Sequence, residues 1–177
     1  MHEAGNEKSQ STTSLREKLW VGLATFGGSG LFPVAPGTAG SVASFVIWAP
    51  VVLMETPWWL RALLVILVFL VGIPACEYAS SYFKTDDPKQ AVIDEVAGQG
   101  LTLLLAPAVP LQLLIGFLFF RLFDVLKPWP IRWIDRHIHG GLGVMLDDML
   151  AGVFALLCML VLDQWFWGSI EMGWMTP

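Results

Sequence analysis

Charged residues are scarce in this chain of 177 residues: they make up 14% of it, against about 25% in typical soluble domains. The chain also lacks a basic surplus, because 10 Lys and Arg stand against 15 Asp and Glu. This balance disfavours nucleic-acid binding, since such binding needs a basic stripe or patch. Cysteine is nearly absent as well. Cys76 and Cys158 both lie in apolar runs without a partner at metal-ligand spacing, which predicts two small buried hydrophobic residues.

Apolar residues and tryptophan, in contrast, are abundant. The chain is 55% hydrophobic and has nine tryptophans, and its mean hydropathy is +0.64. Such a composition is typical of a membrane protein, and the length suits one domain. We expect residues 1–18, which are polar and rich in Ser and Thr, to be a disordered tail and not a signal peptide. Residues 19–177 are then a single membrane-embedded domain.

Apolar segments separated by polar or proline-containing breaks predict an all-α, polytopic membrane bundle. Segments 39–54 and 58–76 form a predicted helical hairpin, residues 77–93 return to water, and residues 149–167 form a last helix. The segment from 94 to 123 is interrupted at 106–110, so it forms either two short tilted spans or a re-entrant hairpin. Glycines and prolines break the chain before residue 38, which predicts a new helix with Thr38 or Ser41 as its N-cap. Its N-terminus would suit a phosphate.

The basic residues predict the orientation of this bundle. Only Arg61 falls on one side of the predicted topology, and the other nine fall on the opposite side: Lys8, Arg16, Lys18, Lys84, Lys89, Arg121, Lys127, Arg132 and Arg136. Because Lys and Arg accumulate in cytoplasmic loops, we place the second side in the cytoplasm.

Acidic residues gather at the cytoplasmic ends of the predicted helices, in three groups: Asp94 with Glu95, Asp124, and Asp147 with Asp148. Gly98 and Gly152 each follow an acid by four residues, so they let the helices approach closely on the acidic face. Five converging carboxylates need a compensating cation, which predicts Mg²⁺ held by all five. The alternative is that the acids only cap helix N-termini. Capping explains one acid per helix, but it does not explain two adjacent acids. It also does not explain Asp124, which is near a helix C-terminus.

Basic side chains lie next to these acids. Arg121 and Lys127 are spaced to present a cationic edge to the carboxylates, although Arg121 and Asp124 also have the spacing of a simple helical ion pair. Guanidinium and ammonium groups neutralise phosphates. We therefore expect Arg121 and Lys127 to bind a phosphate, with Thr38, Ser41 and Arg132 as further phosphate contacts.

Four stretches of the chain resemble the motifs of the phosphatidylglycerophosphatase A family. They are PGTAGS at 36–41, DEVAG at 94–98, RLFDVLKPWPI at 121–131 and DRHIHGGLGVMLDD at 135–148, and the resemblance covers about residues 20–165. One departure is Val144, where the family more often has isoleucine. The resemblance implies a bacterial inner-membrane enzyme that is Mg²⁺-dependent and converts phosphatidylglycerophosphate to phosphatidylglycerol.

If the chain is such a phosphatase, we expect catalytic roles at the cytoplasmic leaflet for Asp94, Glu95, Asp124 and Asp148. Two competing functions differ in their sequence signals. A CDP-alcohol phosphotransferase also sets Asp and Mg²⁺ at helix ends, but its Asp-x-x-Asp-Gly-x-x-Ala-Arg pattern is absent. A divalent-metal transporter would place its acids near the bilayer midplane.

Overall fold

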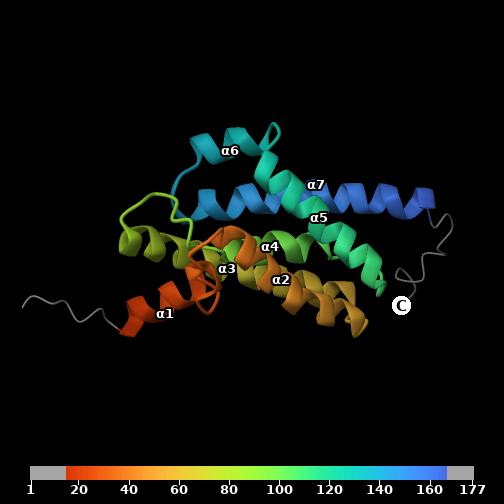
Figure 1. Cartoon of the computed structure of the whole chain (residues 1–177), viewed down its shortest axis with the longest axis horizontal. Coiled ribbons are helices and arrows are strands. Elements are labelled where there is room, and N and C mark those ends of the chain that lie inside the picture. The colour runs from red at the N-terminus through yellow and green to blue at the C-terminus, as the bar shows by residue number, and fades with distance from the viewer. Residues whose placement is uncertain (1–14, 167–177) are drawn as a thin grey trace, which may run out of the picture.

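The computed structural model describes residues 15–166, which form a bundle of helices (Figure 1). In chain order they are α1 (Leu15–Ala24), the 3-10 turn η1 (Ser29–Leu31), α2 (Pro36–Leu53), α3 (Trp58–Phe83), α4 (Ile93–Thr102), α5 (Pro110–Leu126), α6 (Ile131–His137) and α7 (Gly140–Phe166). The all-α prediction is confirmed. The predicted break at 106–110 is also present, because the chain leaves α4 and starts α5 at Pro110.

Three described helices are long and apolar enough to cross a membrane: α2, α3 and the stretch Gly140–Gln164 of α7. At 1.5 Å per residue, the 26 residues of α3 span roughly 39 Å, more than the ~30 Å of a hydrocarbon core. Leu63, Ile66, Leu67 and Leu70 of α3 are each more than half exposed. This outward apolar stripe suits contact with lipid tails.

Helix α4 lies at the centre of the bundle, packed against α2, α3, α5 and α7. Its contact with α7 is a close backbone approach at two glycines. A Cβ on Gly152 would come within 2.5 Å of the Gly98 carbonyl oxygen, and a Cβ on Gly98 within 2.6 Å of the Asp148 carbonyl oxygen. The close approach predicted from the spacing of Gly98 and Gly152 is thus confirmed.

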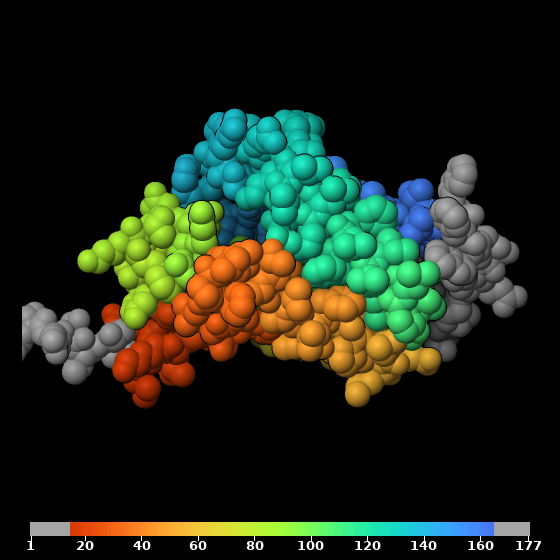
Figure 2. Space-filling view, in the orientation of Figure 1, coloured from red at the N-terminus to blue at the C-terminus, as the bar shows by residue number. Residues whose placement is uncertain are grey.

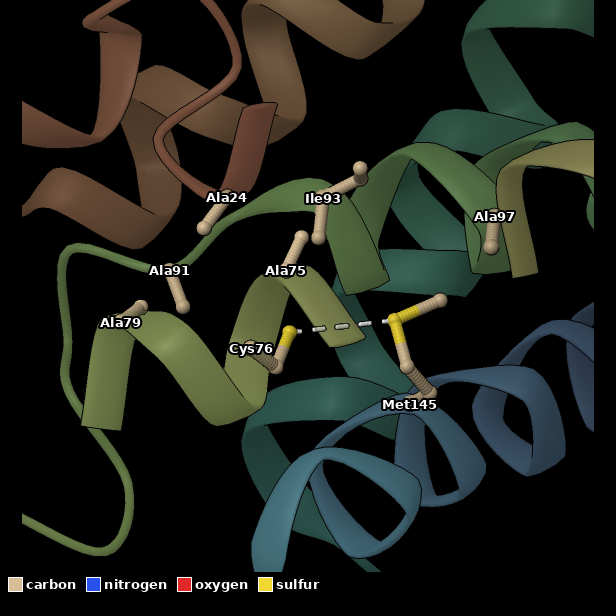
Figure 3. Close-up of a cluster of buried hydrophobic side chains, with 8 residues drawn as sticks. All are labelled: Ala24, Ala75, Cys76, Ala79, Ala91, Ile93, Ala97 and Met145. Atoms are coloured by element: carbon tan, nitrogen blue, oxygen red, sulfur yellow. Dashed lines mark hydrogen bonds between the residues drawn. The ribbon is translucent and has the colours of Figure 1, made fainter. Parts of the chain in front are cut away.

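Small side chains also bring α1, α3 and α4 together beside α7 (Figure 3). The cluster consists of Ala24, Ala75, Cys76, Ala79, Ala91, Ile93, Ala97 and Met145. Cys76 is fully buried in it, as predicted, with its Sγ 3.9 Å from the Met145 Sδ, whereas Cys158 is only partly buried. The small side chains leave the helix backbones free to pack closely.

Two helix starts differ from the sequence-based expectation. Helix α1 begins at Leu15, so the last four residues of the expected tail are helical, while the rest of that tail lies outside the described residues. Helix α2 begins at Pro36 with Ala35 as its N-cap, and no side chain caps it. The prediction of Thr38 or Ser41 as the N-cap was wrong because proline already has the φ of a first helical residue.

Two further boundaries were also wrong. Helix α3 continues seven residues beyond Cys76, to Phe83, because nothing breaks it before Lys84 adopts a left-handed conformation. Helix α7 begins at Gly140 and not near Met149, with the φ of Gly140 at +74°. Asp147 and Asp148 therefore lie about two turns inside α7, and the alternative that they cap its N-terminus is excluded.

The connections between the helices lie toward the two ends of the bundle. In Figure 1, α1, α6 and the loop after α3 gather toward one end, and the α2–α3 and α4–α5 connections toward the other. Arg61 is buried near these connections. Its guanidinium donates to the carbonyl oxygens of Thr56 at 2.7 Å and of Ala106 at 2.9 Å. It thereby satisfies one backbone acceptor in the α2–α3 connection and one in the α4–α5 connection, which lie outside the helices.

Candidate active site

A polar cavity of about 280 Å³ opens where five segments meet. Figure 2 shows the hollow between the start of α2, the loop after α3 and the end of α5. The cavity is lined by Pro36, Gly37, Asp87, Pro88, Lys89, Ala91, Asp94, Glu95, Arg121, Asp124, Val125, Lys127, Val144, Asp147 and Asp148. All five predicted metal-binding carboxylates and both principal phosphate-binding cations thus face one cavity.

Glu95 is the best-connected acid of the cavity. The Ser41 hydroxyl donates to its Oε2 at 2.5 Å and accepts a hydrogen bond from the Arg121 Nη1 at 2.8 Å. The same Nη1 lies 2.5 Å from the Asp124 Oδ2 and 3.5 Å from the Glu95 Oε1. Ser41 therefore links α2 to the acid on α4 and to the cation on α5.

The glycines of the PGTAGS motif make room for this acid. A Cβ on Gly37 would lie 2.8 Å from the Glu95 Oε1, and one on Gly40 would lie 2.9 Å from the Oε2 and 2.4 Å from the Val92 Cβ. Any larger residue at these positions would push α2 away from α4. The motif brings the α2 backbone against α4, the helix that carries Asp94 and Glu95. From the sequence, the motif was expected only to begin a helix that could bind a phosphate.

The paired glycines 140 and 141 fix the start of α7 against α3. The Gly141 N–H donates to the Glu77 Oε2 at 2.8 Å. A Cβ on Gly141 would lie 2.0 Å from the Ile73 carbonyl oxygen, so only glycine fits there. Seven residues later, this anchored helix carries Asp147 and Asp148 into the cavity.

Lys127 bridges two acids from different helices. Its Nζ lies 2.5 Å from the Asp135 Oδ1 on α6 and forms a second, shorter contact with the Asp147 Oδ2 on α7. Its left-handed backbone, with φ of +42°, ends α5 and turns the chain toward α6. Burial favours the neutral amine, but Asp147 and Asp135 outweigh burial and raise the pKa of Lys127, which is therefore charged.

The acids on α4, which lies outside the three candidate spans, are held where ionisation is costly. Burial raises the pKa of the Glu95 carboxyl to about 8, although the Ser41 hydrogen bond and Arg121 oppose the rise. Burial, followed by repulsion from Glu95 and Asp147, raises the pKa of Asp94 well above its ordinary range. Unlike Glu95, Asp94 has no cationic group within ion-pair distance among residues 15–166.

Asp148 is the most isolated acid. The residue is 3% exposed, and its Oδ2 is buried without a hydrogen-bond partner in the described part of the chain. A buried carboxylate oxygen with no partner costs free energy. Within the described residues, however, no three His, Cys, Asp or Glu side chains are already arranged as a metal site. Among the acids of the cavity, Asp147 is paired with Lys127, and Glu95 and Asp124 with Arg121.

Not every predicted residue reaches the cavity. Ser41 is fully buried behind its wall, Thr38 is exposed at the start of α2, and neither lines it. Arg132 is also exposed and donates to the Leu126 carbonyl oxygen at 3.0 Å, at the end of α5. The phosphate-binding roles of these three residues stay predictions.

Two charged residues of the cavity, Asp87 and Lys89, were not predicted from the sequence. They stand in the loop after α3, which had the composition of an ordinary solvated turn. Their only signal in the sequence was nearness to Asp94, five to seven residues away. The loop reaches the cavity because Pro88 is buried and the Val92 N–H donates to the Ala24 carbonyl oxygen at 2.9 Å.

The fold and the cavity define a class: an α-helical protein with candidate membrane spans and a pocket of acids and bases suited to a phosphate ester. Comparison with known proteins narrows this class. The family model for phosphatidylglycerophosphatase A matches residues 22–163. The chain belongs to the phosphatidylglycerophosphatase A family, so it is a phosphomonoesterase, and the predicted function is confirmed.

Individual relatives agree with the family match. A phosphatidylglycerophosphatase A from Escherichia coli K12 is 41% identical over 77% of this chain and 78% of its own length. A phosphatidylglycerophosphatase A from Haemophilus influenzae is 34% identical over 81% and 88%. A putative phosphatidylinositol-3-phosphatase from Bacteroides thetaiotaomicron is 35% identical over 80% and 91%. No solved structure is similar enough to count as a match.

Proposed function

We propose that the protein removes the terminal phosphate of phosphatidylglycerophosphate in the cavity between α2, α4, α5 and α7, with Mg²⁺ as its cofactor. One observation carries the proposal: five acids and two cations, from α4, α5, α7 and the turn after α5, face a single cavity. Helix capping does not account for this arrangement, because Asp147 and Asp148 lie inside α7. The family membership favours hydrolysis over the phosphotransferase and transporter alternatives.

The chemistry of the acids fits a hard divalent cation. Carboxylate oxygens are the ligands that Mg²⁺ takes from proteins, usually one or two of them together with water and substrate phosphate. Asp94 and Asp148 lack cationic partners among the described residues, and the Asp148 Oδ2 has no hydrogen bond. We assign these two as the first ligands, and Asp124, Glu95 and Asp147 as the further acids from which additional ligands would come. When bound, Mg²⁺ would polarise the phosphoryl group and lower the pKa of a water molecule.

The side chains of the cavity then have distinct roles. Arg121 and Lys127 bind the phosphoryl oxygens and neutralise the negative charge that develops on them. Ser41 acts through other residues, because it orients both Arg121 and Glu95. One of the acids Asp94, Glu95, Asp124 and Asp148 accepts the proton of the attacking water. Thr38 and Arg132, at the exposed surface, would contact the lipid headgroup outside the cavity.

We place the protein in the inner membrane of a bacterium, with the cavity facing the cytoplasm. Three described helices are candidate spans, and the relatives named above are bacterial. Lys89, Arg121 and Lys127 line the cavity, while Arg61 is near the opposite end of the bundle. This distribution supports a cytoplasmic cavity by the positive-inside rule.

Phosphate release from phosphatidylglycerophosphate by the purified protein tests the proposed function. We expect release to require Mg²⁺ and to fall about 10²–10³-fold in Asp94→Asn, Asp124→Asn and Asp148→Asn, the scale of one well-placed electrostatic interaction. Asp86→Asn is the matched control, because this exposed neighbour of the cavity does not line it. Undiminished release in EDTA would rule out the metal, and full activity of all three variants would rule out this cavity.

A further inference from the structure

The three cations that line the cavity differ in their partners. Arg121 pairs with Asp124 and Glu95, and Lys127 pairs with Asp135 and Asp147. Lys89 makes no ion pair or hydrogen bond with any residue from 15 to 166. Among the cavity cations of residues 15–166, only the Lys89 ammonium can bind an anion without first losing a protein partner.

The backbone that carries Lys89 is fixed, although its side chain is exposed. A Cβ on Gly30 would lie 2.1 Å from the Gln90 carbonyl oxygen, so η1 packs directly on the residue after Lys89. The Ala91 N–H donates to the Pro88 carbonyl oxygen at 2.8 Å and closes the turn around Lys89. The ammonium therefore extends from a defined point on the wall of the cavity.

The depth of the cavity separates its charges. Glu95, Asp147 and Asp148 are each at most 6% exposed, and they form the inner wall. Lys89 and Val125 are exposed, and they lie where the cavity meets its surroundings. A ligand that fills the cavity would have one end against the buried acids. The next part of the same ligand, toward the mouth of the cavity, would lie beside Lys89.

We propose that Lys89 is a specificity-determining residue that binds the bridging phosphodiester of the lipid substrate. This proposal rests on the proposed function. The substrate has two phosphates, a terminal monoester and a diester next to the diacylglycerol, separated by one glycerol. With the terminal phosphate at the buried acids, Arg121 and Lys127, the diester lies toward the mouth of the cavity. Lys89 is there as its counter-ion, which favours lipids with two phosphates over those with one.

Steady-state kinetics of wild type and Lys89→Gln in mixed micelles test this role. We expect the KM for phosphatidylglycerophosphate to rise about three- to fivefold with kcat unchanged, because a partly solvated ion pair contributes up to about 1 kcal/mol. Lys89→Arg should keep the wild-type KM. Lys84→Gln is the matched control, since Lys84 is an exposed lysine at the start of the same loop that does not line the cavity.

Two inhibitors then distinguish the two phosphates. Phosphatidylglycerol carries only the diester, and inorganic phosphate mimics only the terminal group. Lys89→Gln should raise the inhibition constant of phosphatidylglycerol about three- to fivefold and leave that of inorganic phosphate within twofold. Equal effects on both inhibitors, an effect on phosphate alone, or no inhibition of wild type by phosphatidylglycerol would overturn the role of Lys89. A wild type that releases no phosphate from phosphatidylglycerophosphate would instead overturn the proposed function.

Discussion

Asp148→Asn tests whether the most buried acid of the cavity holds the divalent cation. The substitution keeps the shape of the side chain and removes its charge, at a position that is 3% exposed and has an Oδ2 without a partner. Because this carboxylate lacks protein partners for its Oδ2, its charge should stabilise the folded protein only when a cation is bound. The variant should therefore be no less stable than wild type in EDTA.

The expected size of the effect follows from ligand linkage. A cation present at about 100 times its dissociation constant stabilises the folded state by about 2.7 kcal/mol. For a chain of this length, each kcal/mol moves Tm by about 2–4 °C, so Mg²⁺ should raise the wild-type Tm by roughly 5–11 °C. Asp148→Asn should lose most of this rise.

Thermal unfolding in detergent, followed across a Mg²⁺ titration, measures both quantities. Asp86→Asn should behave like wild type, because its side chain is outside the cavity. A Mg²⁺-dependent rise of the same size in Asp148→Asn would show that Asp148 is not a ligand. A large loss of Tm in EDTA would show that the carboxylate has a structural role that the metal proposal does not include.

Three further predictions test the topology, the helix packing and the role of Lys127. Single cysteines at exposed positions 86 and 136, without Cys76 and Cys158, should be shielded from an impermeant thiol reagent in intact cells, and labelling from outside would contradict a cytoplasmic cavity. Gly98→Ala should lower the unfolding free energy by about 1–3 kcal/mol, because the new Cβ meets the Asp148 carbonyl. Gly22→Ala, with open space at its Cβ, should not lower it. Lys127→Ala should raise the KM for lipid. It should not weaken the Mg²⁺ binding measured without lipid, because Asp147 loses a competing partner. Weaker Mg²⁺ binding of the variant in a thermal titration would refute this.

Local patterns predicted the helices and the close contact at Gly98 and Gly152, because spacing along one helix determines which residues share a face. The start of α7 was not predictable in this way. Gly140 and Gly141 have the composition of a loop, and they begin a helix because Ile73 and Glu77 of α3 meet them. That information lies in a helix more than sixty residues earlier.

The lining of the cavity was also predicted only in part, because local sequence patterns do not record long-range contacts. The five acids, together with Arg121 and Lys127, were recognised as candidates because charge is rare in so apolar a chain, and all seven line one cavity. Asp87 and Lys89 were missed because a polar loop has the same composition whether it faces water or a cavity. Its placement depends on contacts of Gly30 and Ala24 with the loop backbone, and no periodicity records them.

The contact between α4 and α7 has a consequence for how the cavity can change. Because Gly98 and Gly152 bring main chain against main chain, the distance between the acids of α4 and α7 is set by two backbones and not by adjustable side chains. Repacking neighbouring residues would leave that distance almost unaltered. A divergent enzyme that required a wider carboxylate cage, for a larger ion or a bulkier phosphate ester, would have to acquire side chains at these two glycines.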